Sequence, residues 1–280
     1  LSFTHDKEGR GTLMAKAIYD PALARVDDIS GASASFAIEP LHKGYGNTLG
    51  NSIRRVLLSS VRGGAIVAFR VEGATHEFTT IEDVKEDVVD ISLNLKGVRL
   101  RVHTDEPIEL RLEKQGAGEI TAADIKVSAD VEIVNPEHVI ATIDDPKKSV
   151  IMDLVVEAGR GYQTIESSSE TRLHSDMIAL DAMFTPVLRV RYKVDSTRVG
   201  DETNLDKLTL VIDTDGTMTP REAFEEAAAS LVSQYSALAG STTVTGAPAL
   251  GVAGDEGESE LDMPIEELNL SARTTNALIN

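Results

Sequence analysis

The stretch from Leu41 to Arg62 combines glycines, amides and arginines in a pattern that could bind either an anion or a protein partner. Its charged residues are Lys43, Arg54, Arg55 and Arg62, with no acidic residue, whereas the whole chain carries 27 basic and 46 acidic residues and a formal net charge of −19. A basic cluster in so acidic a chain predicts a negatively charged partner surface. Because a uniformly negative surface repels phosphate, any contact with nucleic acid should be local.

A helix near residues 47–61 would present this stretch as two different faces. The apolar face consists of Leu49, Ile53, Val56 and Leu57. The polar face consists of Asn47, Asn51, Arg54 and Leu58, at spacings of four, three and four, with Arg55 beside it. Arginine suits partner contact because its planar fork bonds carboxylates or carbonyls bidentately while its stem packs on apolar surface. The alternative is a merely solvated helix face, which is what most charged faces are.

The glycines of GYGNTLG raise a second possibility, because glycines before a helix can expose backbone N–H groups to a phosphate. Gly44, Gly46 and Gly50 do not follow G-x-G-x-x-G spacing, and no G-K-[ST] follows them. Glu39-Pro40 also interrupts the connection from the preceding strand. Nucleotide binding is therefore disfavoured.

Other catalytic or metal-binding patterns are missing from the sequence. There is no cysteine, and the six histidines are not paired at helical ligand spacing, so we expect no bound metal or cofactor. Glu82, Asp83, Glu86, Asp87 and Asp90 belong to the wet side of an expected helix, where carboxylates ordinarily serve as solvating charge. Neither a nucleophile elbow nor an Asp cluster suited to Mg²⁺ occurs, so no catalytic residue is predicted.

Alternating apolar and polar residues predict antiparallel strands over much of the chain. The clearest lie near residues 33–38, 98–102, 108–113, 188–194 and 208–213, and in the fourth of them Leu188, Val190, Tyr192 and Val194 should face inward. A second helix is expected from Ile81 to Lys96, with Gly97 as its C-terminal cap. The predicted fold class is α+β: an antiparallel sheet with two long helices, plus a β-rich inserted subdomain.

A third helix should begin at Thr219-Pro220-Arg221-Glu222, a capping-box pattern with proline at the first helical position. Its apolar residues recur at spacings of four, three, four and three: Phe224, Ala228, Leu231, Tyr235 and Leu238. So narrow a stripe suits close packing against another helix. Packing on the chain's own sheet is the alternative.

The two ends of the chain differ in composition from the rest. Residues 1–30 show no sustained period and are expected to form a leader, to which we assign no function. Residues 239–263 are rich in Gly, Ala, Ser and Thr and hold acidic but no basic residues, as in a flexible linker. Residues 264–280 return to helical character, like the start of a further domain.

The segment PLHKGYGNTLGNSIRRVLLSS resembles the signature of bacterial RNA polymerase alpha subunits. HEFTTIEDVKEDVVDISLNLKGV, GEITAADI, TPVLRVRYKVD, TNLDKLTL and IEELNLSARTTNALIN follow in the order found in that family. The resemblance, which covers roughly residues 30–280, implies a dimerisation subdomain made from residues 30–62 and 185–240 and an inserted β-rich subdomain from 63–184. The apolar stripes of the first and third helices would then form the dimer interface.

The resemblance also implies what the chain does: as a non-catalytic subunit of a nucleotidyltransferase in the bacterial cytoplasm, its homodimer nucleates assembly with beta and beta-prime. The residues matching the family's large-subunit contacts are Asn47, Gly50, Asn51, Arg54, Arg55, Leu58, His76 and Lys96. Arg273 and Asn276 match residues of a C-terminal domain that contacts promoter DNA and activators. Two rival hypotheses are a nucleotide-using enzyme built on the glycine-rich segment and a stand-alone β-rich interaction module.

Overall fold

The computed structural model describes residues 3–5, 11–13, 22–74, 76–165, 177–200 and 202–239. The chain divides into two compact units, Leu1–Gly240 and Ser241–Asn280. The second unit, with Arg273 and Asn276, lies outside the described residues, as does most of the expected linker. Near the N-terminus, β1 (Phe3–His5) and β2 (Gly11–Leu13) pair as a small antiparallel ribbon.

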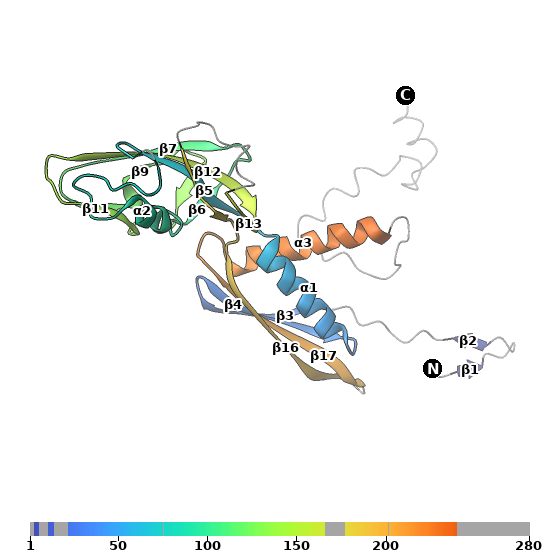
Figure 1. The fold of residues 1–280 in the computed structure, drawn as a ribbon. Coiled ribbons are helices and arrows are strands. Elements are labelled where there is room, and N and C mark those ends of the chain that lie inside the picture. The colour runs from blue at the N-terminus through green and yellow to red at the C-terminus, as the bar shows by residue number, and fades with distance from the viewer. Residues whose placement is uncertain are drawn as a thin grey trace, which may run out of the picture. The chain divides into compact units, whose positions relative to one another are not determined.

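An antiparallel sheet of four strands carries two long helices (Figure 1). Its order is β16-β17-β4-β3. The elements are β3 (Ala22–Ser30), β4 (Ser33–Leu41), α1 (Tyr45–Ser59), β16 (Val187–Val199), β17 (Glu202–Thr214) and α3 (Pro220–Ala239). Its strands come from segments before and after residues 62–183, so those residues form an insertion between α1 and β16. We call these six elements the four-stranded part.

The core of the four-stranded part follows the expected alternation. Phe36, Leu210 and Ile212 are fully buried against α1 and α3, and Phe36 stacks on Phe224 with ring centroids 4.9 Å apart. The expectation for Leu188 is wrong: its side chain is 60% exposed, because a bulge between Val187 and Arg189 turns Val187 inward instead.

The prediction that residues 22–30 belong to a loose leader is also wrong. They form β3, which pairs along β4 from Ala22↔Glu39 to Ser30↔Ser33. The segment ALARVDDIS lacks strict alternation because β3 is an edge strand, whose side chains are mostly exposed. Edge strands tolerate acidic residues such as Asp27 and Asp28, which discourage pairing with other chains.

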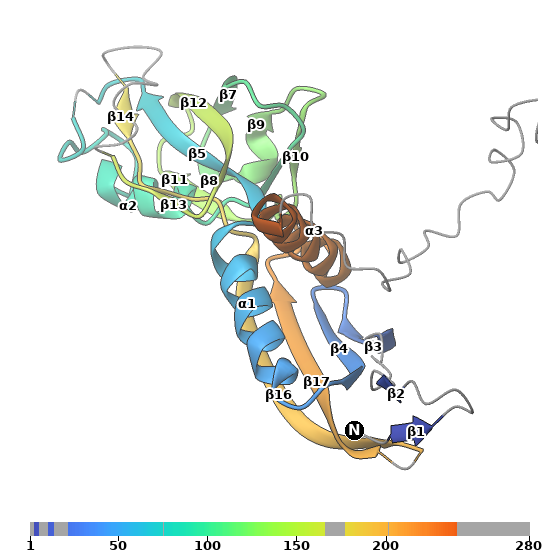
Figure 2. The same ribbon diagram turned by 90° about the vertical axis from the view of Figure 1, so that its right-hand side faces the viewer.

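Helix α1 lies along β16, as Figure 2 shows, and buries one narrow face against β16 and β17. The buried residues are Gly46, Gly50, Ile53 and Leu57, while Leu49 and Val56 are half-buried beside them. The helix begins two residues earlier than expected, at Tyr45.

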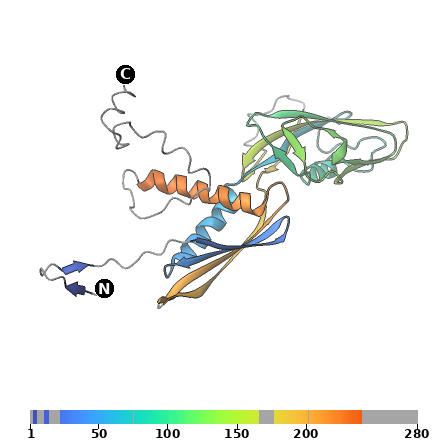
Figure 3. The ribbon, with the colours of Figure 1, turned by 180° about the vertical axis from the view of Figure 1, so that it is seen from behind.

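Helix α3 begins at the predicted position, and its capping box is present. Glu222 N donates to Thr219 Oγ1 at 3.2 Å, and Thr219 N donates to Glu222 Oε2 at 2.8 Å. The first half of the helix covers the sheet through Ala223 and Ala227, which are buried. From Val232 onward every described side chain of α3 is exposed. The view from behind shows this helix extending beyond the strands (Figure 3).

Residues 62–183 form a second body of structure, which we call the seven-stranded part. Its main sheet has the order β10-β6-β5-β12-β7-β9, with β14 pairing on β5. These strands are β5 (Arg62–Val71), β6 (Leu100–Val102), β7 (Ile108–Gln115), β9 (Ile125–Lys126), β10 (Val131–Ile133), β12 (Ser149–Arg160) and β14 (Ile178–Ala179). Smaller pairs are β8 (Gly118–Thr121) with β11 (Val139–Ile143), and β13 (Tyr162–Gln163) with β15 (Ala182–Met183). A 3₁₀ turn, η1 (Ala122–Asp124), joins β8 to β9.

Helix α2 (Val88–Leu95) is shorter than the predicted helix of residues 81–96. Asp87 caps its N-terminus by accepting a 2.7 Å hydrogen bond from Asp90 N. Before it, Asp83 has φ of 63° and Val84 bridges to Ile143, so residues 81–87 form turns. The cap at the other end is Lys96 in the right-handed region, and Gly97 does not fill that role.

None of the helices in the described ranges is both long and apolar enough to cross a membrane.

Candidate functional site

The outer face of α1 carries polar side chains that have no partner in the part of the chain that is described. Asn47, Asn51, Arg54 and Arg55 are exposed, and their side chains make no hydrogen bond or ion pair there. Leu58, 38% exposed, extends the same face by one turn. This grouping agrees with the predicted polar stripe. We call Asn47, Asn51, Arg54, Arg55 and Leu58 the outer face of α1.

Gly50, which the sequence resemblance also assigns to the large-subunit contacts, does not belong to the outer face. It is buried against the sheet, where an added Cβ would lie 2.7 Å from Tyr192 Cδ2 and 3.0 Å from Leu208 Cδ1. Glycine lets α1 approach β16 and β17 closely. The spacing Gly46, Gly50, Ile53, Leu57 is itself a four-three-four stripe, the signal that could have placed Gly50 inside.

The N-terminus of α1 is closed by a carboxylate from β17. Asp206 Oδ2 accepts hydrogen bonds from Gly44 N at 2.8 Å and Gly46 N at 3.2 Å. Gly44 supplies no side-chain cap, and its φ of 90° suits glycine. The backbone donors that a phosphate would need are therefore already occupied by an anion of the chain itself. This finding argues against the nucleotide-binding alternative, and no sequence pattern pointed to Asp206.

Lys96 lies on the seven-stranded part but close to the end of α1. Its ammonium is 3.7 Å from Asp181 Oδ2, and both residues line a pocket of about 470 Å³. Thr185, in the same pocket, donates from Oγ1 to Leu58 O at 3.5 Å. Lys96 and Thr185 thus line one pocket, and Thr185 also bonds the backbone of Leu58 near the end of α1.

His76 lies in the segment between β5 and α2, where its ring bonds Thr79 Oγ1 at 3.0 Å. It is exposed, but it does not line the pocket that contains Lys96.

The residues expected at a dimer interface fall into three groups by exposure. Ile53 and Leu57 are 6% and 0% exposed and belong to the chain's own core. Leu49, Val56, Phe224, Ala228 and Leu231 are half-buried. Tyr235 and Leu238 are 55% and 83% exposed, as is Val232 at 64%, which the sequence pattern missed. Among the described residues expected at the interface, those in the second half of α3 are the most exposed.

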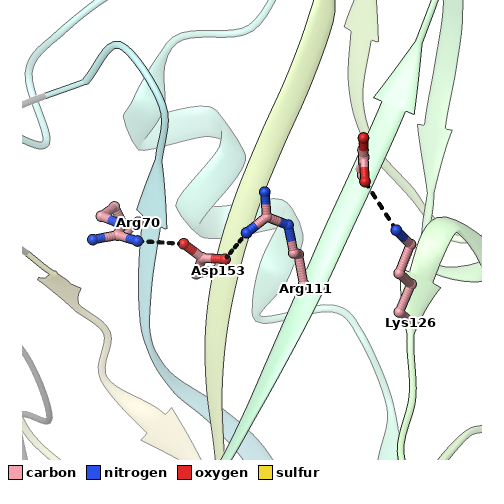
Figure 4. A network of polar contacts seen from close by, with 5 residues as sticks. Arg70, Arg111, Lys126 and Asp153 are labelled. Atoms are coloured by element: carbon pink, nitrogen blue, oxygen red, sulfur yellow. Dashed lines mark hydrogen bonds and ion pairs between the residues drawn. The ribbon is translucent and has the colours of Figure 1, made fainter.

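A pocket of about 480 Å³ on the seven-stranded part holds two arginines, but their charge is partly balanced. Arg70 NH2 lies 2.6 Å from Asp153 Oδ2, and Arg111 NH1 lies 3.7 Å from Asp153 Oδ1 (Figure 4). These residues stand opposite one another on β5, β12 and β7. On the neighbouring strand Lys126 bonds Glu113 at 2.9 Å. Such cross-strand pairs stabilise a sheet.

The perturbed carboxyl groups do not assemble an acid–base pair. Burial raises the pKa of Glu157 on β12, whose Oε1 has no hydrogen-bond partner among the described residues. Hydrogen bonds from the Thr219 backbone and hydroxyl lower the pKa of Glu222, as its capping role requires. Within the described residues no group of three or more His, Asp or Glu is arranged to hold a metal.

Comparison with known proteins identifies the family. The model of the RNA polymerase Rpb3/RpoA insert domain matches residues 67–185. The chain is 44% identical over 268 residues to DNA-directed RNA polymerase subunit alpha of Roseiflexus sp. (strain RS-1), covering 92% of this chain and 81% of that protein. Identity to the alpha subunit of Clavibacter michiganensis subsp. michiganensis (strain NCPPB 382) is 42% over 254 residues, covering 90% and 76%. Identity to the alpha subunit of Moorella thermoacetica (strain ATCC 39073 / JCM 9320) is 44% over 245 residues, covering 87% of this chain and 78% of that protein. The chain therefore belongs to the family of DNA-directed RNA polymerase alpha subunits.

Proposed function

We propose that this chain is a non-catalytic assembly subunit of RNA polymerase: it homodimerises, and the dimer recruits the beta and beta-prime subunits. In the complete cytoplasmic enzyme, at the nucleoid, these would perform the nucleotidyltransferase reaction. This chain would contribute position, not catalytic groups, cofactor or metal.

The observation that carries the docking proposal is the unpartnered outer face of α1. In a chain of net charge −19, carboxylates are abundant, yet Arg54 and Arg55 pair with none among the described residues. Other arginines are engaged: Arg62 bonds Asp105, Arg70 bonds Asp153, and Arg189 bonds Asp213. An arginine pair left available on a rigid helix suits bidentate contact with carboxylates or carbonyls of a partner.

The rigidity of α1 adds to this support. Its inner face is fixed by Ile53 and Leu57 in the core, and its N-terminus is fixed by Asp206. A partner that binds the outer face would therefore not have to order the helix first, which lowers the entropic cost of binding.

The dimer proposal rests on the second half of α3. Val232, Tyr235 and Leu238 are exposed apolar side chains on a single helix. Next to them, Val56, Ser60, Arg160 and Leu231 line a pocket of about 470 Å³ between the end of α1 and α3. A second copy could insert apolar side chains from its own α3 there, in an isologous contact.

The C-terminal proposal rests on the sequence resemblance alone. Arg273 and Asn276 match residues that contact the DNA minor groove, so the C-terminal domain that begins at residue 264 would bind promoter DNA and activators. Residues 239–263 would tether it to the rest of the chain.

Sedimentation of the purified chain with separately produced beta subunit tests the docking proposal. We expect a complex of two copies of this chain with one beta, and then beta-prime joining that complex. Two components that sediment independently at micromolar concentration would contradict it. Saturable binding of a labelled nucleoside triphosphate by the chain alone would favour the rival nucleotide-using enzyme.

A further inference from the structure

Two arginines of the seven-stranded part donate hydrogen bonds to main-chain carbonyls of the four-stranded part. Arg99, just before β6, donates from NH1 to Asp215 O at 2.8 Å. Arg101, on β6, donates from Nε to Thr217 O at 2.6 Å. Both acceptors belong to the turn between β17 and α3. The segment 99–101 therefore bonds the turn at two points.

The turn is prepared to receive these donors. Asp215 Oδ1 accepts from Thr217 N at 2.9 Å and from Thr217 Oγ1 at 2.6 Å, which fixes the loop between the two acceptor carbonyls. Thr214 Oγ1 donates to Met218 O at 2.9 Å, which ties the two ends of the turn together. Thr217 is only 7% exposed, so its carbonyl is held in a largely water-excluded place. A carbonyl in such a place requires a partner.

The two donor arginines are also positioned by contacts within the seven-stranded part. Arg99 N donates to Asn135 Oδ1 at 2.8 Å, and Asn135 Nδ2 donates to Gly97 O at 2.9 Å. The guanidinium of Arg101 also lies 3.5 Å from Glu132 Oε2 on β10. Lys96, Gly97 and Arg99 line the same pocket, together with Asp215 and Thr217 of the turn.

Without these contacts the connection would resemble a hinge. The chain passes between the two parts only twice within the described residues, once before β5 and once before β16. The two passages touch: a Cβ on Gly63 would lie 1.8 Å from Phe184 O. With two adjacent connections alone, the seven-stranded part could still rotate relative to the four-stranded part about the axis through them. Connecting segments of this kind commonly act as hinges. The bonds of Arg99 and Arg101, together with Arg62 N to Glu226 Oε1 at 3.1 Å, attach the parts at further points.

We propose that Arg99 and Arg101 are positioning residues, whose hydrogen bonds to the Asp215–Thr217 turn lock the seven-stranded part onto the four-stranded part. The lock presents Lys96 and the outer face of α1 to a large subunit as one preformed surface. The second statement rests on the proposed docking function, whereas the first does not.

The test measures the mobility of the two parts directly. The chain has no cysteine, so Glu137→Cys and Lys193→Cys would supply the only two thiols for a pair of fluorophores, one on each part. Labelled chains are mixed with an excess of unlabelled chains, so that single-molecule energy transfer reports the distance within one copy. The variants are Arg99→Ala, Arg101→Ala and the double substitution. The matched control is Arg111→Ala, which removes an arginine that pairs with Asp153 inside the seven-stranded part.

We expect the double variant to broaden the distance distribution and the control to leave it unchanged. If the docking-competent orientation falls to one tenth of the population, the apparent affinity for the beta subunit falls about tenfold. An unchanged distribution in a folded double variant would overturn the lock. A broadened distribution with undiminished capture of beta would overturn its positioning role.

Arg55→Ala separates this inference from the docking function. It should weaken capture of beta without broadening the distribution. If neither Arg55→Ala nor the double variant changes capture, the docking function fails, while a broadened distribution would still support the lock. Both arginines are exposed, so the single variants should fold. Chemical denaturation of each variant checks that its fold is retained.

Discussion

The carboxylate of Asp206 accepts a 2.8 Å hydrogen bond from the backbone N–H of Gly44, 162 positions earlier in the chain. Together with the bond from Gly46, it gives α1 the anionic N-terminal cap that its own sequence does not provide. This bond joins the start of α1 to β17, and so it fixes the helix that carries the proposed docking surface.

Replacing Asp206 with alanine should therefore destabilise the chain. Loss of an N-terminal cap costs about 0.5–2 kcal/mol, and loss of a negative charge at the positive end of the helix adds to it. Chemical denaturation measures the change in the free energy of unfolding. Asp195→Ala removes an acid that pairs with the exposed Lys193 and should change stability by less than about 0.5 kcal/mol. Equal effects of the two substitutions would argue against the cap.

Gly50→Ala should also be destabilising, although alanine inside a helix is ordinarily better than glycine by about 0.5–1 kcal/mol. The new Cβ would meet Tyr192 and Leu208 at 2.7 and 3.0 Å, and overpacking of a core costs about 1–3 kcal/mol. The overpacking term is the larger. Asn51→Ala, next to it on the outer face, is the control and should have almost no effect on unfolding. A more stable Gly50→Ala chain would show that α1 can move away from the sheet.

The stability contributed by Asp213 should depend on pH. A hydrogen bond from Ser33 and a bond from Arg189 lower the pKa of this carboxyl below its ordinary value. A group whose pKa is lower when folded stabilises the fold fully above its unfolded pKa, about 3.9, and loses that contribution as pH falls through the folded pKa. Asp213→Asn should therefore cost stability at pH 7 and progressively less below about pH 4. A cost that stays constant from pH 7 to pH 3 would contradict this account.

Charges placed on the second half of α3 should separate the proposed dimer. Tyr235 and Leu238 are exposed within one copy, so Tyr235→Asp with Leu238→Asp should leave the fold of the single chain intact. In sedimentation at micromolar concentration we expect monomers. Phe78→Asp removes an equally exposed apolar side chain, 79% exposed, from the seven-stranded part and should leave dimers. Dimers in both variants would mean that copies meet elsewhere.

The sequence predicted those elements whose local signals agree with their environment. The Thr219–Glu222 capping box lies within four residues, so its pattern was sufficient to place the start of α3. Alternation predicted the strands around Phe36 and Leu210 because each has one buried face. The start of α2 was predicted seven residues too early, since Val84 continues the helical period but pairs with Ile143 instead.

The exposed face of α1 was predicted in outline, and the features that the sequence could not place have a common cause. Asn47, Asn51, Arg54 and Arg55 are polar and lie outside, as expected. Gly50 has no side chain to reveal which face it occupies, and Asp206 acts on α1 from another strand. Ile53 and Leu57 are apolar in either a core or an interface, so their residue types could not distinguish the two. Contacts between distant segments decide all of these cases.

The most direct test of the docking account is the affinity of the Arg55→Ala chain for the beta subunit. Arginines at the centre of an interface commonly contribute about 2 kcal/mol or more, so the Kd should rise about 30-fold or more. The dimer should persist in sedimentation, because Arg55 lies on the exposed side of α1. The matched control is Arg191→Ala, another exposed arginine, on β16, which should bind beta like the original chain. An unchanged Kd for Arg55→Ala, with the fold and dimer intact, would contradict the account.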